Sequence, residues 1–201
     1  MTKTEFAARL QQACASVTAA EQELTEIDSK FGDADHGLTM TKIAGAISGA
    51  VAESDGGIQS MLDDAAMAVM VLNGGSAVPL WNTWLDGMQE NAPDGDEIDT
   101  AGLQAIFARA LEALNEMSGA QVGDKTMMDA LIPASEAVAA YTGDSADELF
   151  DAAAQAAAQG AEATKQYVSK FGRAKSYGTK TIGTPDAGAV SMSWFFQGLA
   201  R

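Results

Sequence analysis

The chain has 201 residues, of which 47% are hydrophobic, 28 are acidic and 12 are basic, giving a formal net charge of −16. This length and apolar fraction predict one packed domain over residues 1–201 rather than a disordered chain. The acidic charge argues against nucleic acid and anionic membranes as partners, and without a signal peptide or an apolar run of about 18 residues a cytoplasmic protein is expected.

Hydrophobic residues recur at helical spacing along nearly the whole chain, and no segment alternates strictly enough to predict a strand. Capping-box spacing predicts helix starts at Thr2–Glu5 and Ser145–Glu148, and Pro185 suits the first turn of the last helix. Gly160, in the alanine-rich seventh helix, suits close helix–helix contact. The predicted helices span about residues 4–27, 40–51, 58–72, 80–88, 103–117, 126–141, 145–170 and 185–199.

Eight helices joined mostly by short loops favour an all-α, antiparallel, up-and-down arrangement. In that topology every second loop lies at the same end. One end then receives the chemically unusual loops, which are residues 28–37, 73–79, 119–128 and 172–188. The other end receives ordinary turn and acidic residues at 53–57, 90–99 and 142–145. The sequence therefore predicts a site built from four loops at one end.

Three aspartates and the only histidine fall within the first unusual loop. Asp28, Asp33 and Asp35 are close enough in sequence for their carboxylates to repel, and each would protonate unless a cation lay between them. Magnesium prefers carboxylate, water and phosphate oxygens and fits such a cluster. A solvated acidic loop is the alternative on spacing alone. His36 follows at a helix start, where either a structural role or donation to a phosphate is open.

The other unusual loops are rich in glycine. Residues 74–76 leave backbone N–H groups uncovered before a predicted helix, where an anion can approach, although a tight turn needs no ligand. Residues 119–126 resemble a P-loop only superficially, because the spacing is one residue short and a helix precedes them. Residues 165–180 are basic, as either a solvated helix end or a phosphate-binding patch. The basic residues there are Lys165, Lys170, Arg173, Lys175 and Lys180.

Five segments, in order over nearly the whole chain, resemble a known family: EIDSKFGDADHGLTM, NGGSAVPLW, GAQVGDKTMMDALIPA, ATKQYVSKFGRAKSYG and GTPDAGAVS. They are similar to the L subunit of dihydroxyacetone kinase, the nucleotide-binding part of a multi-subunit phosphotransferase. The resemblance implies an eight-helix antiparallel barrel that holds ADP or ATP with two Mg²⁺ ions at one end.

The resemblance also implies roles for single residues. Asp28, Asp33 and Asp35 would be the metal ligands, and Arg173 and His36 would act in phosphoryl transfer. Both of these would also contact the nucleotide. The other implied nucleotide contacts are Gly37, Leu38, Thr39, Gly75, Ser76, Gly119, Thr126, Met127, Asp186, Ala187 and Gly188.

Two residues depart from the family pattern. Ala34 stands where a glycine is usual, which is expected to be a mild change. Val78 also replaces a usual glycine, and it is expected to hinder the close approach of a phosphate.

In the resembled family a separate K subunit carries dihydroxyacetone and docks over the nucleotide end. An M subunit of the phosphotransferase system can then rephosphorylate ADP in place. The chain would be inactive alone, and a homodimer is expected. The alternative within this class is a subunit that exchanges free ATP in a triose or tetrose kinase, such as one for erythrulose. A regulatory module that contacts a transcription factor and a plain acidic helical bundle are the alternatives of other classes.

Overall fold

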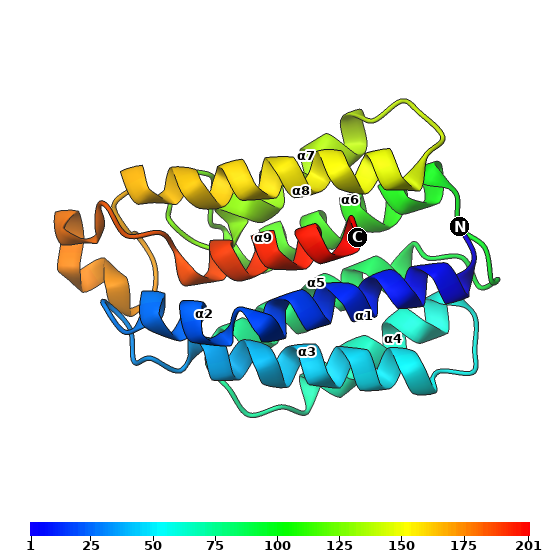
Figure 1. Ribbon diagram of the computed structural model, residues 1–201, viewed down its shortest axis with the longest axis horizontal. Coiled ribbons are helices and arrows are strands. Elements are labelled where there is room, and N and C mark those ends of the chain that lie inside the picture. The colour runs from blue at the N-terminus through cyan, green and yellow to red at the C-terminus, as the bar shows by residue number, and fades with distance from the viewer.

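The computed structural model describes residues Met1 to Arg201, and its regular elements are all helices (Figure 1). None of these helices has the length and apolar character needed to cross a membrane. The α-helices are α1 (Lys3–Ala19), α2 (Glu21–Asp28), α3 (His36–Glu53), α4 (Ile58–Met70), α5 (Ala77–Glu90), α6 (Thr100–Ser118), α7 (Met128–Ala140), α8 (Ala146–Ala163) and α9 (Ala187–Leu199). Two 3-10 helices, η1 (Thr164–Gln166) and η2 (Arg173–Thr181), lie between α8 and α9.

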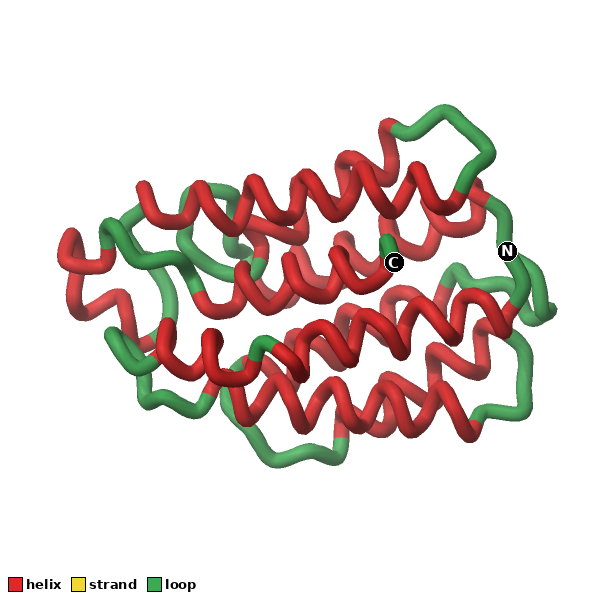
Figure 2. The backbone as a smooth tube through the Cα atoms, viewed as in Figure 1, coloured by secondary structure: helices red, strands yellow, loops and turns green.

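The helices run up and down in chain order and close into a ring. Each packs against the next along the chain, and α9 packs against α1 as well as α8. Figure 2 shows the connecting loops gathered at the two ends of the helices. Since α1 and α2 form one interrupted rod, the predicted eight-helix antiparallel barrel is confirmed.

A continuous cluster of 47 buried hydrophobic residues fills the ring, so the helices share one core. Its centre is aromatic, with ring centroids 5.1 to 6.4 Å apart among Trp81, Trp84, Phe107, Phe195 and Phe196. Such pairs contribute about 0.5–1.5 kcal/mol each beyond the area they bury. Trp81 also lines a cavity at one end of the barrel, so this aromatic cluster forms part of the cavity wall.

Two predicted helix starts and one predicted helix contact are present in the structure, one of the starts with only half of its capping box. The capping box of Thr2 and Glu5 is present in full. At Ser145 only half of the box forms, because its Oγ accepts from the backbone N–H three residues later while the glutamate bonds elsewhere. Close packing at Gly160 is confirmed, since a Cβ there would lie 2.0 Å from the Asp129 carbonyl oxygen in α7.

The helix predicted for residues 4–27 is interrupted at Ala20, whose ψ of 5° ends α1. The start of α3 packs against this break, because a Cβ on Gly37 would lie 2.1 Å from the Glu21 carbonyl oxygen. Thr41 Oγ1 also donates to the Glu21 carboxylate at 2.8 Å. The break therefore accompanies a tertiary contact that hydrophobic periodicity does not report.

The helix predicted to reach about residue 170 ends earlier, because α8 stops at Ala163. At the end of α8, the Thr164 carbonyl accepts from the buried Lys125 ammonium at 2.6 Å. A side chain from a distant loop thus satisfies a carbonyl at the helix terminus. The following residues are released into the loop that carries η2.

Two other helix starts lie later than predicted. α7 begins at Met128 rather than Thr126, whose Oγ1 accepts from the Met128 N–H at 3.2 Å. Pro185 lies before the first turn of α9, because Asp186 is the N-cap and accepts from the Ala189 N–H at 2.8 Å. Both shifts lengthen the loops at the same end of the barrel.

Candidate functional site

Residues from all four predicted loops line one cavity of about 570 Å³ at the end of the barrel. That volume lies within the range of small-molecule sites, about 300–1,000 Å³. Part of the lining carries carboxylates from the α2–α3 loop. Another part is apolar and comprises Pro79, Leu80, Trp81, Met117, Met127 and Phe171. The cavity therefore suits a ligand with one charged and one flat or apolar portion.

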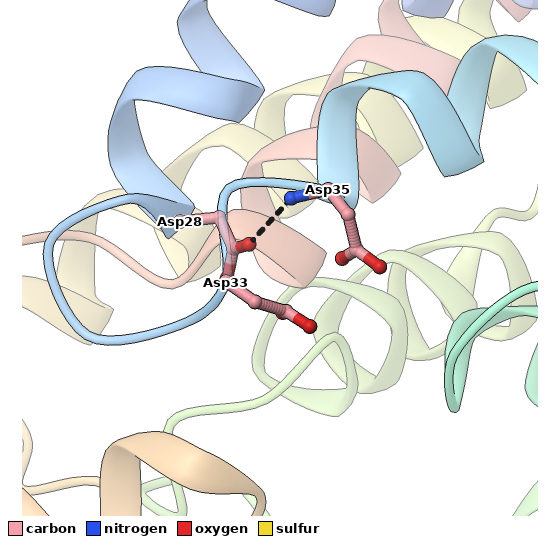
Figure 3. A group of neighbouring side chains, drawn as sticks. All are labelled: Asp28, Asp33 and Asp35. Atoms are coloured by element: carbon pink, nitrogen blue, oxygen red, sulfur yellow. Dashed lines mark hydrogen bonds between the residues drawn. The ribbon is translucent and has the colours of Figure 1, made fainter.

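The carboxylates of Asp28, Asp33 and Asp35 each offer an oxygen within 4.8 Å of the others. Asp28 is the last residue of α2, and the Asp35 N–H donates to its Oδ2 at 3.2 Å (Figure 3). Arg173 Nη1 lies 2.6 Å from Asp33 Oδ2, so the cluster already accepts a cationic partner. Hard carboxylate oxygens at the negative end of a helix suit a divalent cation such as Mg²⁺.

Alternate helices of the barrel begin at the cavity. The first residues of α3, α5 and α9, which are His36, Ala77 and Ala187, all line it. No side chain caps the start of α3 or of α5. At α3 the first backbone N–H groups keep free hydrogen-bonding capacity, whereas at α5 only the Ala77 N–H does, because the Val78 N–H bonds to the Gly75 carbonyl and Pro79 has none. A helix N-terminus carries about half a positive charge. These two starts can therefore bind an anion beside the carboxylates that suit a cation.

The η2 segment crosses from the far side of the cavity to the aspartate loop. Arg173 pairs with Asp33, and the Tyr177 ring lies 5.2 Å from the Phe31 ring. Gly172, before η2, has a φ of 60°, which favours glycine. The Arg173 side chain is 70% exposed, so this ion pair contributes only about 0–1 kcal/mol. The guanidinium can exchange a carboxylate for another anion at little cost.

Residues 30–201 match the family model described as the DAK2 domain. The chain belongs to the DAK2 domain family. The resemblance inferred from the sequence motifs is thereby confirmed.

The DAK2 chain is 37% identical over 199 residues to the L-erythrulose kinase of Pectobacterium atrosepticum, covering 93% of this chain and 32% of that protein. It is 30% identical over 190 residues to PEP-dependent dihydroxyacetone kinase 2, ADP-binding subunit DhaL, of Listeria innocua, covering 92% of this chain and 87% of that protein. The crystal structure of the dihydroxyacetone kinase from C. freundii with AMP-PNP and Mg²⁺ shares the fold, with a TM-score of 0.72 at 24% identity, over 97% of this chain and 33% of that one. The chain thus spans about a third of the first curated relatives it matches, at 31% and 32% of their lengths.

His36 of the DAK2 chain joins α3 to α9. Its Nε2 lies 3.2 Å from Ser191 Oγ, whose own proton goes to the Gly188 carbonyl at 2.9 Å. That hydroxyl oxygen can therefore accept from an Nε2–H. Burial lowers the pKa of His36 despite the neighbouring Asp28 and Asp35, which favours the neutral ring. A phosphate contact by His36 stays a prediction, since the bond to Ser191 already explains its position.

Two aspartates to which the sequence gave no structural role, the buried Asp129 and the partly exposed Asp186, shape this end of the DAK2 barrel. Asp129 is fully buried and accepts from the backbone N–H groups of Gly123 and Thr126 at 2.6 and 2.7 Å. Burial raises the pKa of Asp129. Burial also raises the pKa of Asp186, to about 7. Asp186 lines the cavity, where a partly protonated carboxyl can donate as well as accept. Asp129 lies in the first turn of α7, where acidic residues are common, so no sequence signal marked it.

Three predicted nucleotide contacts do not line the cavity. Gly37 is a glycine because α3 packs on α2, as the clash with the Glu21 carbonyl shows. The Leu38 side chain is 51% exposed, and Gly119 is the left-handed C-cap of α6. The other predicted site residues all line the cavity: Asp28, Asp33, Asp35, His36, Thr39, Gly75, Ser76, Thr126, Met127, Arg173, Asp186, Ala187 and Gly188.

Val78 does not obstruct the cavity as expected. Its side chain is buried and packs against Gly74, where a Cβ would lie 2.6 Å from Val78 Cγ2. Val78 is also absent from the cavity lining. The departure from the family pattern at this position therefore alters core packing next to the loop and leaves the cavity open.

Ala34 is a larger departure than the sequence suggested. It lies between two of the clustered aspartates with a φ of 61°, in the left-handed region. A Cβ in that conformation costs about 1–2 kcal/mol, a cost that glycine avoids. The aspartate loop of this DAK2 chain therefore holds a strained residue.

Replacing Ala34 with glycine is expected to stabilise the chain by about 1 kcal/mol, or about 2–4 °C in melting temperature, because the strain is removed. The matched control is Ala108→Gly, an exposed site in the middle of α6. That change should destabilise by about 1 kcal/mol, since glycine is a poor helix former. Thermal unfolding of both variants measures the two signs. A lowered melting temperature for Ala34→Gly would contradict the strain.

Proposed function

We propose that this chain is the ADP- or ATP-binding subunit of a dihydroxyacetone-type kinase, which transfers a phosphoryl group to a small keto-sugar held on a partner K subunit. The observation that carries the proposal is one cavity that joins three clustered aspartates, uncapped helix starts and an apolar wall. The Listeria relative, an ADP-binding subunit, and the C. freundii complex with AMP-PNP and Mg²⁺ support it.

Phosphoryl transfer depends mainly on positioning and on neutralising the phosphate charge, and bound Mg²⁺ supplies part of that neutralisation. In this proposal Asp28, Asp33 and Asp35 hold the metal, with two ions as in the resembled family. Arg173 exchanges Asp33 for the transferring phosphate, which it can contact with two parallel N–H groups. The uncapped N–H groups at the starts of α3 and α5 bind phosphate oxygens.

The remaining predicted contacts have complementary places in this scheme. Ser76 Oγ makes no capping bond at the start of α5, so it stays available to a phosphate. Met127 is largely buried and lines the cavity with other apolar residues, as suits the base of a nucleotide. Asp186 lies at the start of α9, where a partly protonated carboxyl can bond to ribose or base.

A second candidate is the nucleotide subunit of an erythrulose-type kinase in which free ATP exchanges. The identity of 37% to the L-erythrulose kinase, against 30% to the ADP-binding subunit, favours it. Coverage favours the first candidate, since the chain spans 87% of the separate subunit and 32% of the erythrulose kinase. Both candidates use the same cavity and differ in the acceptor and in how the nucleotide is recharged.

The partner surface is proposed to be the cavity end. There η2 and its flanks expose Phe171, Tyr177 and Ile182 at 41%, 45% and 50%, among the basic residues of segment 165–180. This mixed apolar and basic surface on an otherwise acidic chain suits a partner with an acidic rim. We also propose that an M subunit rephosphorylates the bound ADP. The chain is further proposed to form a homodimer and to be located in the cytoplasm.

Titration of the purified chain with ADP tests the proposed function. Binding is expected with Mg²⁺ and not with a chelator, because the carboxylates and the phosphates repel each other without the metal. A hundredfold excess of ligand over its Kd should stabilise the fold by about 2.7 kcal/mol. Calorimetry and thermal unfolding measure the two effects. ADP affinity that is equal in Mg²⁺ and in chelator, or no binding at all, would contradict the proposal.

A further inference from the structure

Lys125 is buried at the edge of the cavity and donates to backbone oxygens alone. The residue is 4% exposed. The ammonium lies 2.6 Å from the Thr164 carbonyl oxygen, 3.2 Å from that of Tyr167, 2.9 Å from that of Thr181 and 2.6 Å from that of Thr184. No carboxylate lies within ion-pair distance of it.

The four carbonyls bracket the segment that carries Arg173. Two of them, from residues 164 and 167, precede η2, one comes from its last residue, Thr181, and one from residue 184 follows it. The Lys125 ammonium, which comes from a different loop, therefore holds together the two ends of the 164–184 segment between α8 and α9. The neighbouring residue Asp124 adds a second tie, since its carboxylate pairs with Lys170 at 2.6 Å.

The chemistry of this cage is specific to an ammonium group. Four carbonyl oxygens around one point suit a compact charge with protons directed to several sides. A planar guanidinium presents its donors in a fixed fork and cannot point them at four surrounding oxygens. Burial lowers the pKa of Lys125, and the charges of Asp186 and Asp129 oppose that shift.

The consequence lies at the mouth of the cavity. The residues held between the two pairs of carbonyls include Gly172 and Arg173, and Arg173 reaches Asp33 across the opening. The contact at Asp33 is exposed and weak, so it cannot by itself hold the segment in place. The buried cage at Lys125 is the stronger anchor of the same segment.

We propose that Lys125 is a positioning residue for phosphoryl transfer, which acts by setting the 164–184 segment so that Arg173 stands over the aspartate cluster. This inference rests on the proposed function. Lys125 itself touches neither nucleotide nor acceptor in this role. Loss of the cage should leave nucleotide binding largely intact and misplace Arg173, and a displacement of about 1 Å can lower a rate about a hundredfold.

The test compares Lys125→Met with Lys42→Met, a control at an exposed lysine of α3 that lies outside the cavity lining and outside the 165–180 segment. In Lys125→Met, trypsin should cut the native chain severalfold faster at Lys170, Arg173, Lys175 and Lys180. With the K subunit and Mg²⁺-ATP, its kcat should fall about a hundredfold while its Kd for Mg²⁺-ADP changes little. Lys42→Met should resemble the unchanged chain in all three measurements.

Two further variants separate positioning from general stability. Lys125→Arg should not restore kcat, because the planar guanidinium cannot donate to the four surrounding carbonyl oxygens. In propylammonium chloride, Lys125→Ala should regain both its resistance to trypsin and its kcat. Sodium chloride of equal ionic strength should restore neither. This rescue decides the matter if Lys125→Met does not fold.

Three results would overturn the proposal: unchanged cleavage and kcat in a folded Lys125→Met chain, an equal loss of kcat and ADP affinity, or an alanine variant that no ammonium ion restores. The protease comparison needs no nucleotide. If the unchanged chain binds no ADP, the proposed function fails, while the cleavage rates still show whether Lys125 holds the segment.

Discussion

Replacing Asp35 with alanine is expected to abolish measurable Mg²⁺-dependent ADP binding while the fold survives. Each carboxylate within about 4 Å of a cation contributes several kcal/mol even at an effective dielectric constant of about 20. Loss of one ligand should therefore weaken ADP binding about a thousandfold. The Asp35 side chain is exposed and caps no helix end, so no structural bond is lost.

The empty Asp35→Ala chain should melt no lower than the unchanged chain, because one of three mutually repelling carboxylates is removed. Asp55→Ala, at an exposed loop position between α3 and α4, is the control for loss of one charge. Calorimetry in Mg²⁺ and in chelator measures ADP binding for both. Unchanged ADP affinity in Asp35→Ala would refute the metal cluster as the nucleotide anchor.

The parts of the fold that depend on local signals were predictable from the sequence. α6 matches its predicted span to within a few residues, because its apolar stripe ends at caps that its own residues provide. Asp99 accepts from the Gly102 N–H at the start, and Gly119 adopts a φ of 63° at the end. The gathering of four loops at one end followed from counting such helices, since direction alternates along the chain.

The features that were missed depend on partners far away in sequence. The interruption of the first helix at Ala20 accompanies the packing of Gly37, and α8 ends where Lys125 takes the Thr164 carbonyl, 39 residues away in sequence. Periodicity describes one helix at a time and carries no information on such contacts. A buried lysine is also rare, so composition alone favours a solvated lysine over a cage of carbonyls.

The candidate site shows the same division. The aspartate cluster was predictable because three ligands lie within one short loop, where spacing alone brings them together. The conformation of Ala34 was not, because a positive φ at alanine has no sequence signature. Which cavity residues touch the nucleotide stays a prediction, and Gly37 shows that a family motif also contains residues whose role is packing.

The isolated chain is expected to phosphorylate no keto-sugar, even with saturating Mg²⁺-ATP. Groups that could capture a ketone are already engaged in the structure. His36 is bonded to Ser191, Lys125 is held by carbonyls and Lys170 pairs with Asp124. The cavity thus has candidate metal and phosphate contacts but no free histidine or lysine to align an acceptor with the γ-phosphate. Alignment accounts for about 7–11 kcal/mol in such reactions, so its absence removes activity.

A partner is expected to supply this alignment and to complete the cover over the cavity, of which η2 forms one part. Two thirds of the erythrulose kinase lies outside its match to this chain, since the chain covers 32% of that protein, which leaves room for an acceptor-binding part. The measurement is sugar phosphorylation with Mg²⁺-ATP and either dihydroxyacetone or erythrulose, with and without the candidate K subunit. Robust phosphorylation by the isolated chain would contradict the two-subunit proposal. Activity that needs the K subunit and ATP but no phosphotransferase donor would select the free-ATP version, because recharging in place would then be unnecessary.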